Sequence, residues 1–152
     1  MPHSFTQIHI HYVFSPKFQF PVLSGDKRDH ILNYIAGICK NYDCHLLCGF
    51  LMPDHAHLLI HISATHSVAE IAKVIKANTS RWLNTQPDRK LRFEWQEGYG
   101  AFSCSYSQLE GVKGYIQNQE EHHKGQSFEE EYRTLLIRHN IDVPSCRTDG
   151  GL

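Results

Sequence analysis

The segment His55-Ala56-His57 carries the side chains in this sequence that are best suited to chemistry. In a β-strand, residues two apart point to the same face with Cα atoms about 7 Å apart, so both imidazoles can reach one metal ion. An isolated His-x-His is more often an ordinary strand pattern, but this pair opens a strand directly after the Pro53-Asp54 turn. We therefore expect a divalent cation site at an accessible end of a sheet.

A second candidate lies in a later helical segment, where Tyr115 and Gln119 are four residues apart. Residues at this spacing share one stripe of a helix. A tyrosine hydroxyl, with a pKa near 10, is a poor nucleophile unless a cation draws charge from the phosphate that it attacks. Gln119 offers a neutral oxygen as a third ligand to such a cation. Taken alone, Tyr115 is more often a half-buried aromatic residue of the helix.

The elements that position these residues follow from the spacing of apolar side chains. Period-two alternation predicts strands, and 3.6-residue periodicity predicts helices. The predicted strands cover residues 7–14, 44–52, 55–62 and about 101–104, and the predicted helices cover residues 26–42 and 68–84. A capping box at Ser107 predicts a helix that carries Tyr115 and Gln119, and another at Ser127 predicts a last helix to about His139.

This order, β-α-β-β-α-β followed by two helices, is that of the ferredoxin-like split βαβ fold in the α+β class. The first and third strands are then neighbours in the middle of an antiparallel sheet. The first strand carries His9 and His11 on one face, so we expect these histidines, with His61, on or near the face of the His55–His57 pair.

Composition favours one soluble domain. A chain of 152 residues with 41% hydrophobic and 20% charged residues predicts a single domain over residues 1–140, with 141–152 as a disordered tail. No apolar run is long enough to cross a membrane, so we expect a cytoplasmic protein. The five cysteines include no Cys-x-x-Cys pair, which disfavours a disulfide framework or zinc ribbon. A net charge of −1 argues against general coating of duplex DNA but allows a local basic groove.

Four ordered blocks of the sequence resemble the motifs of a known enzyme family. They are Ile10-His11-Tyr12-Val13-Phe14-Ser15-Pro16-Lys17, Met52-Pro53-Asp54-His55-Ala56-His57-Leu58-Leu59, Gly98-Tyr99-Gly100-Ala101-Phe102-Ser103 and Tyr115-Ile116-Gln117-Asn118-Gln119-Glu120-Glu121-His122-His123. Together they resemble the HUH single-strand tyrosine transposases, which include the insertion-sequence-200-like and REP-associated enzymes. The resemblance covers roughly residues 5–140. Ala56 departs from it, because the family usually has a larger apolar residue there.

The resemblance implies a transposase and endonuclease for hairpin-containing single-stranded DNA. His55 and His57 match the metal-binding pair, Tyr115 the nucleophile and Gln119 a third ligand for Mg²⁺ or Mn²⁺. Attack by Tyr115 would give a 5′-phosphotyrosine and a free 3′-hydroxyl, which can later rejoin strands without ATP. The family also implies a homodimer, although some members act as monomers.

Further residues are candidates for supporting roles. Lys17, Lys76 and Arg81 are candidate contacts to the DNA backbone, although such residues are often merely solvated. His11, His122 and His123 are candidate auxiliary residues. The last two could bind a phosphate, add a ligand or lie at a helix C-terminus where imidazolium suits the helix dipole, and we favour the helix terminus.

Two other functions compete with the transposase. A non-cutting DNA-binding or regulatory protein of the same ancestry would not need all four of His55, His57, Tyr115 and Gln119, which disfavours it. A replication initiator or relaxase shares the histidine pair but usually has a larger chain. A covalent protein–DNA product would distinguish the transposase from the non-cutting protein.

Overall fold

A four-stranded antiparallel sheet forms the middle layer of the protein, in the order β2-β3-β1-β4. The structure is a computed structural model that describes residues 3–18, 23, 25–87 and 91–142. The strands are β1 (His9–Phe14), β2 (His45–Met52), β3 (His55–His61) and β4 (Gly100–Cys104). The predicted ferredoxin-like arrangement is confirmed, because β1 and β3 lie side by side in the centre.

Alternation along β1 and β3 divides their side chains between two different layers. Ile10, Tyr12 and Phe14 of β1 join Leu58 and Ile60 of β3 in the largest apolar core. The residues between them, which include the histidines, point to the opposite face of the sheet.

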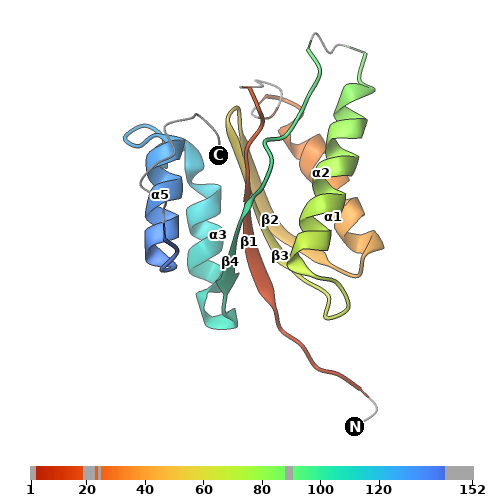
Figure 1. The fold of residues 1–152 in the computed structure, drawn as a ribbon, viewed down its shortest axis with the longest axis vertical. Helices are drawn as coiled ribbons and strands as arrows, with labels where there is room; N and C mark the ends of the chain where they lie inside the picture. The colour runs from red at the N-terminus through yellow and green to blue at the C-terminus, as the bar shows by residue number, and fades with distance from the viewer. Residues whose placement is uncertain (1–2, 19–22, 24, 88–90, 143–152) are drawn as a thin grey trace.

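Helices α1 (Arg28–Asn41) and α2 (Val68–Asn84) cover the apolar face (Figure 1). Both lay isoleucines at helical spacing against the sheet, with Ile31 and Ile35 from α1 and Ile71 and Ile75 from α2. The hydroxyl of Ser67 accepts a hydrogen bond from the backbone N–H of Glu70 and caps α2, as the sequence predicts.

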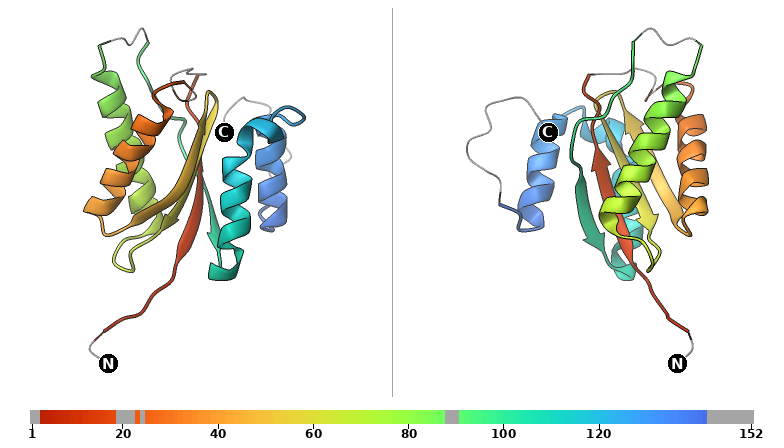
Figure 2. Two further views of the ribbon diagram at one scale, coloured as in Figure 1. Left: turned by 180° about the vertical axis from the view of Figure 1, so that it is seen from behind. Right: turned by 45° about the vertical axis from the view of Figure 1, so that its right-hand side comes forward.

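A second helical layer covers the opposite face, as the two views of Figure 2 show. It consists of a short 3₁₀ turn η2 (Tyr106–Gln108), α3 (Leu109–Gln117), α4 (Gln119–His122) and α5 (Phe128–Arg138). Ser127 caps α5 through the N–H of Glu130, which confirms the predicted start of this helix. The sheet is therefore enclosed between two helical layers.

Two details of the helix after β4 differ from the sequence prediction. The capping box is formed by Ser105 and Gln108, not by Ser107, because Ser105 is the residue that leaves β4 in an extended conformation. The predicted single helix is also broken at Asn118, whose φ of −102° and ψ of 24° leave the helical region. Asparagine is a poor residue for a helix interior because its side chain competes for backbone hydrogen bonds.

No helix among the described residues is long and apolar enough to cross a membrane. The tail predicted for residues 141–152 lies outside the described residues from 143 onward. Ile141 still closes the end of α5, donating its backbone N–H to the carbonyl of Leu136.

Candidate active site

The pairing of β1 with β3 brings histidines from both strands together beneath α3 and α5. Val13 of β1 lies opposite His57, and His11 lies one pair further along the same face. The rings of His11 and His57 stack with centroids 5.0 Å apart, and Nε2 of His11 lies 2.7 Å from Nδ1 of His57. His9 and His61 form a separate pair toward the other end of the strands, with ring centroids 5.2 Å apart.

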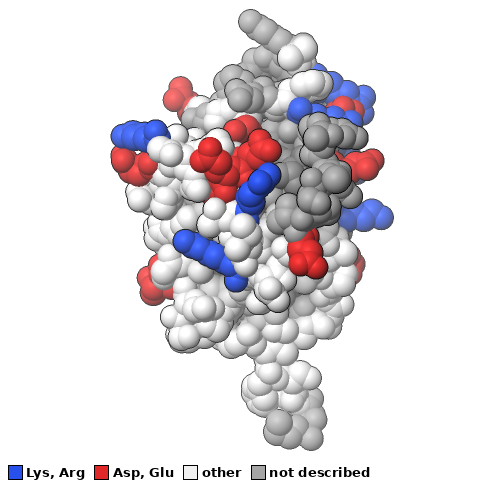
Figure 3. All heavy atoms as spheres, turned by 60° about the vertical axis from the view of Figure 1, so that its left-hand side comes forward, with Lys and Arg blue, Asp and Glu red and all other residues white. Residues whose placement is uncertain are grey.

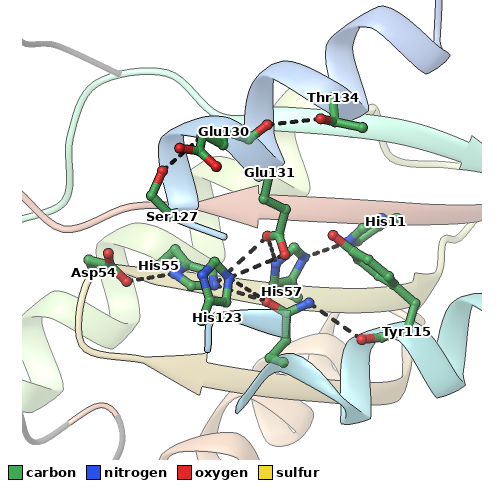
Figure 4. A network of polar contacts seen from close by, with 11 residues as sticks. His11, Asp54, His55, His57, Tyr115, His123, Ser127, Glu130, Glu131 and Thr134 are labelled. Carbon is green, nitrogen blue, oxygen red and sulfur yellow. Dashed lines mark hydrogen bonds and ion pairs between the residues drawn. The ribbon is translucent and has the colours of Figure 1, made fainter. Parts of the chain in front are cut away.

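His55 is held between a carboxylate and an amide. Its Nδ1 lies 2.7 Å from Oδ1 of Asp54, and its Nε2 lies 3.0 Å from Oε1 of Gln119 (Figure 4). A carboxylate that accepts Nδ1–H leaves the Nε2 lone pair free to bind a cation. The hydrogen bond from His55 lowers the pKa of Asp54, so this carboxylate stays charged. Asp54 thus orients His55 toward Gln119.

Glu131 of α5 is a functional candidate that the sequence analysis missed. Its Oε1 lies 2.8 Å from Nε2 of His57 and 3.9 Å from Nε2 of His55. One ligand atom from each of His55, His57 and Glu131 lies within 4.8 Å of the others. A sequence signal existed, because Glu131 is three residues after Phe128 and four before Leu135, on the stripe of α5 that faces the sheet. A carboxylate on an otherwise apolar stripe is rarely buried without a partner.

Tyr115 reaches the same place from α3. Its ring lies with its centroid 5.8 Å from that of His57 and 6.3 Å from that of His11, nearly perpendicular to both. Figure 4 shows the phenol pointing toward the histidines and Glu131. Burial, the charge of Glu131 and a hydrogen bond to it all raise the pKa of Tyr115. The hydroxyl therefore stays protonated until a positive charge is added nearby.

Gln119 lies beside the imidazoles, as predicted, despite the break in the helix at Asn118. Its side chain is fully buried, and Nε2 donates to the backbone carbonyl of Tyr115 at 3.4 Å, so Oε1 faces the imidazoles. The break places Gln119 at the first residue of α4 instead of on the helix of Tyr115. The structure thus brings together all four residues that the sequence analysis singled out, His55, His57, Tyr115 and Gln119.

His123 and His122 lie closer to the site than the favoured interpretation allowed. Nε2 of His123 lies 3.2 Å from Oε1 of Gln119 and 3.2 Å from Oε2 of Glu131. The ring of His122 lies 4.8 Å from that of Tyr115. Both residues lie at the C-terminal end of α4, as predicted, with His123 as its C-cap. In addition, the turn at Asn118 directs α4 so that His123 also contacts Gln119 and Glu131.

The site is more enclosed than predicted. His55 and His57 have 0% of their surface exposed, and Glu131 has 2%. The expectation of an accessible sheet end is wrong, because Phe128 of α5 stacks on His55 with the ring centroids 4.3 Å apart. Burial lowers the pKa of His57 below its usual value, and burial next to His57 lowers that of His11 to about 3. Both imidazoles are therefore neutral near pH 7, the form that binds metals.

The donor set fits a divalent cation. Burial alone would raise the pKa of Glu131, yet hydrogen bonding with His57 brings it to about 2, so the carboxylate is ionised. Its Oε2 is buried without a well-oriented hydrogen bond, although His123 lies nearby. An unsatisfied carboxylate oxygen, two neutral imidazoles and an amide oxygen around one point are an arrangement that a cation would complete.

The predicted DNA contacts lie elsewhere, in a groove of about 1150 Å³ between α2 and residues 91–99. Lys17, Lys76 and Arg81 all line it, together with Lys73 and Arg92. Lys17 pairs with Glu94 at 3.2 Å, whereas Lys76 donates to the backbone carbonyls of Gln96 and Gly98 at 2.8 Å each. Lys76 thus also shapes the wall of the groove.

The groove and the histidine site lie on opposite sides of the sheet. On the groove side of the sheet, Trp82 stacks on Tyr34 with the ring centroids 4.4 Å apart, and Trp95 is buried at the groove wall. Phe18 is exposed four residues beyond the end of β1.

The family model for IS200-like transposases matches residues 4–119, which include β1 to α3 and Gln119. The chain belongs to the IS200-like transposase family. It is 23% identical over 118 residues to the ISDra2 transposase TnpA of Deinococcus radiodurans, covering 74% of this chain and 84% of that protein. It is 26% identical over 119 residues to the transposase of insertion sequence element IS200 from Salmonella typhimurium, covering 75% of this chain and 78% of that protein.

A solved structure shares the fold of this IS200-like chain. It is that of a REP-associated tyrosine transposase bound to a REP hairpin, with a TM-score of 0.60 and 10% sequence identity. The match covers 100% of this chain and 96% of that one. Glu131 and the rest of α5 lie beyond the region matched by the family model, which ends at residue 119.

Proposed function

We propose that this IS200-like transposase cleaves and rejoins single-stranded DNA that carries a hairpin, with Tyr115 as the nucleophile. The observation that carries the proposal is the meeting of Tyr115 with His55, His57 and Gln119 around one buried point. The membership of the family supports transposition, and the solved relative with a bound REP hairpin supports a DNA hairpin as the partner.

The proposed chemistry is an exchange of one phosphoester bond for another. The phenol oxygen of Tyr115 attacks the phosphorus, and the bond from phosphorus to the 3′-oxygen breaks. The phenol loses its proton, and the departing 3′-oxygen gains one, so the products are a 5′-phosphotyrosine and a free 3′-hydroxyl. Rejoining is the same exchange in reverse with a second 3′-hydroxyl.

The chain's own residues prepare this exchange. We propose His55, His57 and Gln119 as ligands of Mg²⁺ or Mn²⁺, with Glu131 as an additional ligand. When bound, the cation supplies positive charge that stabilises the transferring phosphate. Asp54 holds His55 in the ligating tautomer, and His11 does the same for His57 from the neighbouring strand. Mixed nitrogen and oxygen donors favour Mn²⁺ over Mg²⁺ in affinity.

We propose that the groove beside α2 holds the DNA hairpin. It carries five basic side chains, Lys17, Lys73, Lys76, Arg81 and Arg92, in a chain whose net charge is −1. Such a local concentration of positive charge suits a phosphate backbone. The histidines and Tyr115 come from one chain, so a monomer can assemble the whole site, whereas a homodimer remains a proposal from the family.

The decisive experiment is detection of the covalent intermediate. The protein is incubated with single-stranded hairpin DNA and Mn²⁺, and the products are separated on a denaturing gel. We expect a protein–DNA band that disappears in Tyr115→Phe, with hairpin binding changed by no more than a few-fold. Tyr106→Phe is the matched control, since Tyr106 is exposed and lies just before the same helix.

The enclosure of the histidines favours one alternative, a non-cutting DNA-binding protein of the same ancestry. Such a protein would bind the hairpin and give no covalent band under any cation. An adduct that persists in Tyr115→Phe would instead mean that another residue is the nucleophile, and activity in EDTA would contradict the role of the cation.

A further inference from the structure

Helix α5 covers the candidate active site and places the carboxylate of Glu131 at the centre of that site. Oε1 of Glu131 lies 2.8 Å from His57, Oε2 lies 3.2 Å from His123, and the Tyr115 hydroxyl is a further hydrogen-bond partner. Figure 4 shows Glu131 descending from α5 into the space between these residues. A single anion thus contacts His57, His123 and Tyr115 at the centre of the site.

A phosphodiester needs the same place. To be attacked by Tyr115 while bound next to His55 and His57, a phosphate must bring an anionic oxygen between the phenol and the imidazoles. Glu131 fills that position, and it is only 2% exposed. Two anions in one buried space repel each other unless a cation lies between them, because little solvent screens them. Because the carboxylate already fills the space that the phosphate needs, the two cannot both occupy the closed site.

The contacts that hold α5 in place are few and made by side chains. A small apolar cluster joins Tyr132 and Leu135 of α5 to Val13 and Phe102 of the sheet, and Phe128 lies on His55. No backbone hydrogen bond links α5 to another element within the part of the chain that the structure describes. A helix attached in this way can leave while the sheet and α1–α3 stay folded.

The outer surface of α5 carries charges of both signs. Glu129 and Glu130 lie exposed in its first turn, and Arg133 and Arg138 lie exposed further along the helix. Figure 3, which brings this side forward, shows acidic and basic side chains together on it. This surface is therefore no basic groove for DNA, and entry of a strand into the site beneath α5 requires this cover to move.

We propose that Glu131 occupies the position of the scissile phosphate, so that α5 keeps the site closed until single-stranded DNA displaces both. This inference rests on the proposed function, because it takes the phosphodiester of DNA as the competitor. It assigns Glu131 a role that governs access to the site, in addition to contact with the cation. The ligand that opens α5 is therefore DNA, and the cation alone keeps it closed.

Amide hydrogen exchange tests the movement directly. Amide exchange is measured in the full chain carrying Tyr115→Phe, which cannot cleave the DNA. One sample contains Mn²⁺ alone, and the other contains Mn²⁺ plus single-stranded hairpin DNA. We expect exchange across residues 128–138 to become about tenfold faster with DNA, whereas exchange in β1 and β3 stays unchanged or slows. Unchanged or slower exchange in α5 at saturating DNA would overturn the proposal.

A charge-neutral variant tests the competition. Glu131→Gln keeps the shape of the side chain but removes its charge, so we expect the covalent product to form faster, by about tenfold if the closed state dominates. Glu130→Gln is the matched control on the exposed side of the same helix and should behave as the wild type. A slower reaction in Glu131→Gln, with its circular dichroism unchanged, would mean that the carboxylate is a permanent ligand and would overturn the proposal.

The two proposals fail in different ways. If the wild type binds hairpin DNA and opens α5 but forms no adduct, the nuclease function is wrong and the displacement of Glu131 stands. If the wild type forms the adduct while α5 stays protected, the function stands and the displacement is wrong.

Discussion

The two helical layers of this protein cover the same sheet but bury different kinds of side chain. Against α1 and α2 the sheet buries a continuous apolar core. Against α3, α4 and α5 it buries His11, His55, His57, Gln119 and Glu131, with only small apolar clusters around them. Burying ionisable groups costs free energy unless each one is paired, so this layer is held by a network and not by area alone.

The difference teaches how the fold divides its tasks. Each central strand contributes to both layers, because its side chains alternate between the two faces. In β3, Ile60 enters the apolar core while its neighbours Leu59 and His57 face the other layer. The rigid core on one face can therefore fix the imidazoles on the other, while the cover over them remains removable.

The largest expected effect is a loss of activity without a loss of folding, caused by a change on the face of the sheet that carries the histidines. His55→Ala should slow cleavage by roughly 10³-fold, about 4 kcal/mol, since a cation is worth several kcal/mol of charge stabilisation in the transition state. Partial recovery at high Mn²⁺ is expected, because His57 and Gln119 remain. Initial rates of adduct formation measure the effect.

His45→Ala provides the control for that change, because His45 is an exposed histidine on the outer strand of the same sheet. It should leave both the rate and the folding unchanged. An equal loss of rate in the two variants would mean that histidines on this sheet matter generally, and the special place of His55 would be lost.

The next prediction compares how much a buried side chain on each face of the sheet contributes to the free energy of unfolding. Ile60→Ala removes a fully buried side chain from the apolar core and should lower the free energy of unfolding by about 3 kcal/mol. Leu135→Ala in α5 should lower it by about 1 kcal/mol or less, because α5 can detach without global unfolding. Urea denaturation measures both, and equal losses would show that α5 folds as one unit with the sheet.

Much of this division between the two faces of the sheet could be predicted from the sequence. Alternation in residues 7–14 and 55–62 predicted the strands, their central pairing and the histidine face, all of which the structure shows. The strands and their pairing depend on local periodicity and on topology, which a single sequence expresses directly. That His55, His57, Tyr115 and Gln119 would converge was implied by the resemblance of the ordered motifs, because Tyr115 taken alone is more often an ordinary residue of a helix.

The missed features depend on tertiary contacts. Glu131 and the enclosure by Phe128 depend on where α5 docks, and no local pattern states which face of the sheet a last helix covers. The break at Asn118 was missed because the residues around it read as one amphipathic helix, whereas the turn redirects α4 so that Gln119 and His123 reach the histidines. Propensity at one asparagine is too weak a signal to place such a break.

A smaller effect concerns pH and the histidines of the catalytic layer in EDTA. The folded pKa of His11 is about 3, lowered by burial and by His57, against 6.5 for the unfolded chain. Between these values the unfolded state binds more protons, so the free energy of unfolding falls as the pH falls below 6.5. The slope should reach up to about 1.4 kcal/mol per pH unit for this one proton.

Urea denaturation between pH 7.5 and 5 measures that slope, and His11→Phe should make it shallower. An unaltered slope in the variant would show that other groups, such as His9, whose pKa is also lowered by burial, dominate the acid sensitivity of this layer. The α1 and α2 core contributes no such titration, because it is built from apolar side chains.

The smallest expected effect concerns DNA binding by the outer surface of α2, one of the two helices that cover the apolar core. Lys73 of α2 is exposed and lines the basic groove, so Lys73→Ala should weaken hairpin binding a few-fold and reduce the salt dependence by about one counterion. Lys40→Ala on α1, outside the groove, should change neither. The rate of adduct formation at saturating DNA should stay the same in both, because the groove lies across the sheet from Tyr115. Unchanged hairpin binding and an unchanged salt dependence in Lys73→Ala would place the DNA on the histidine side alone, and the division between a binding face and a catalytic face would fail.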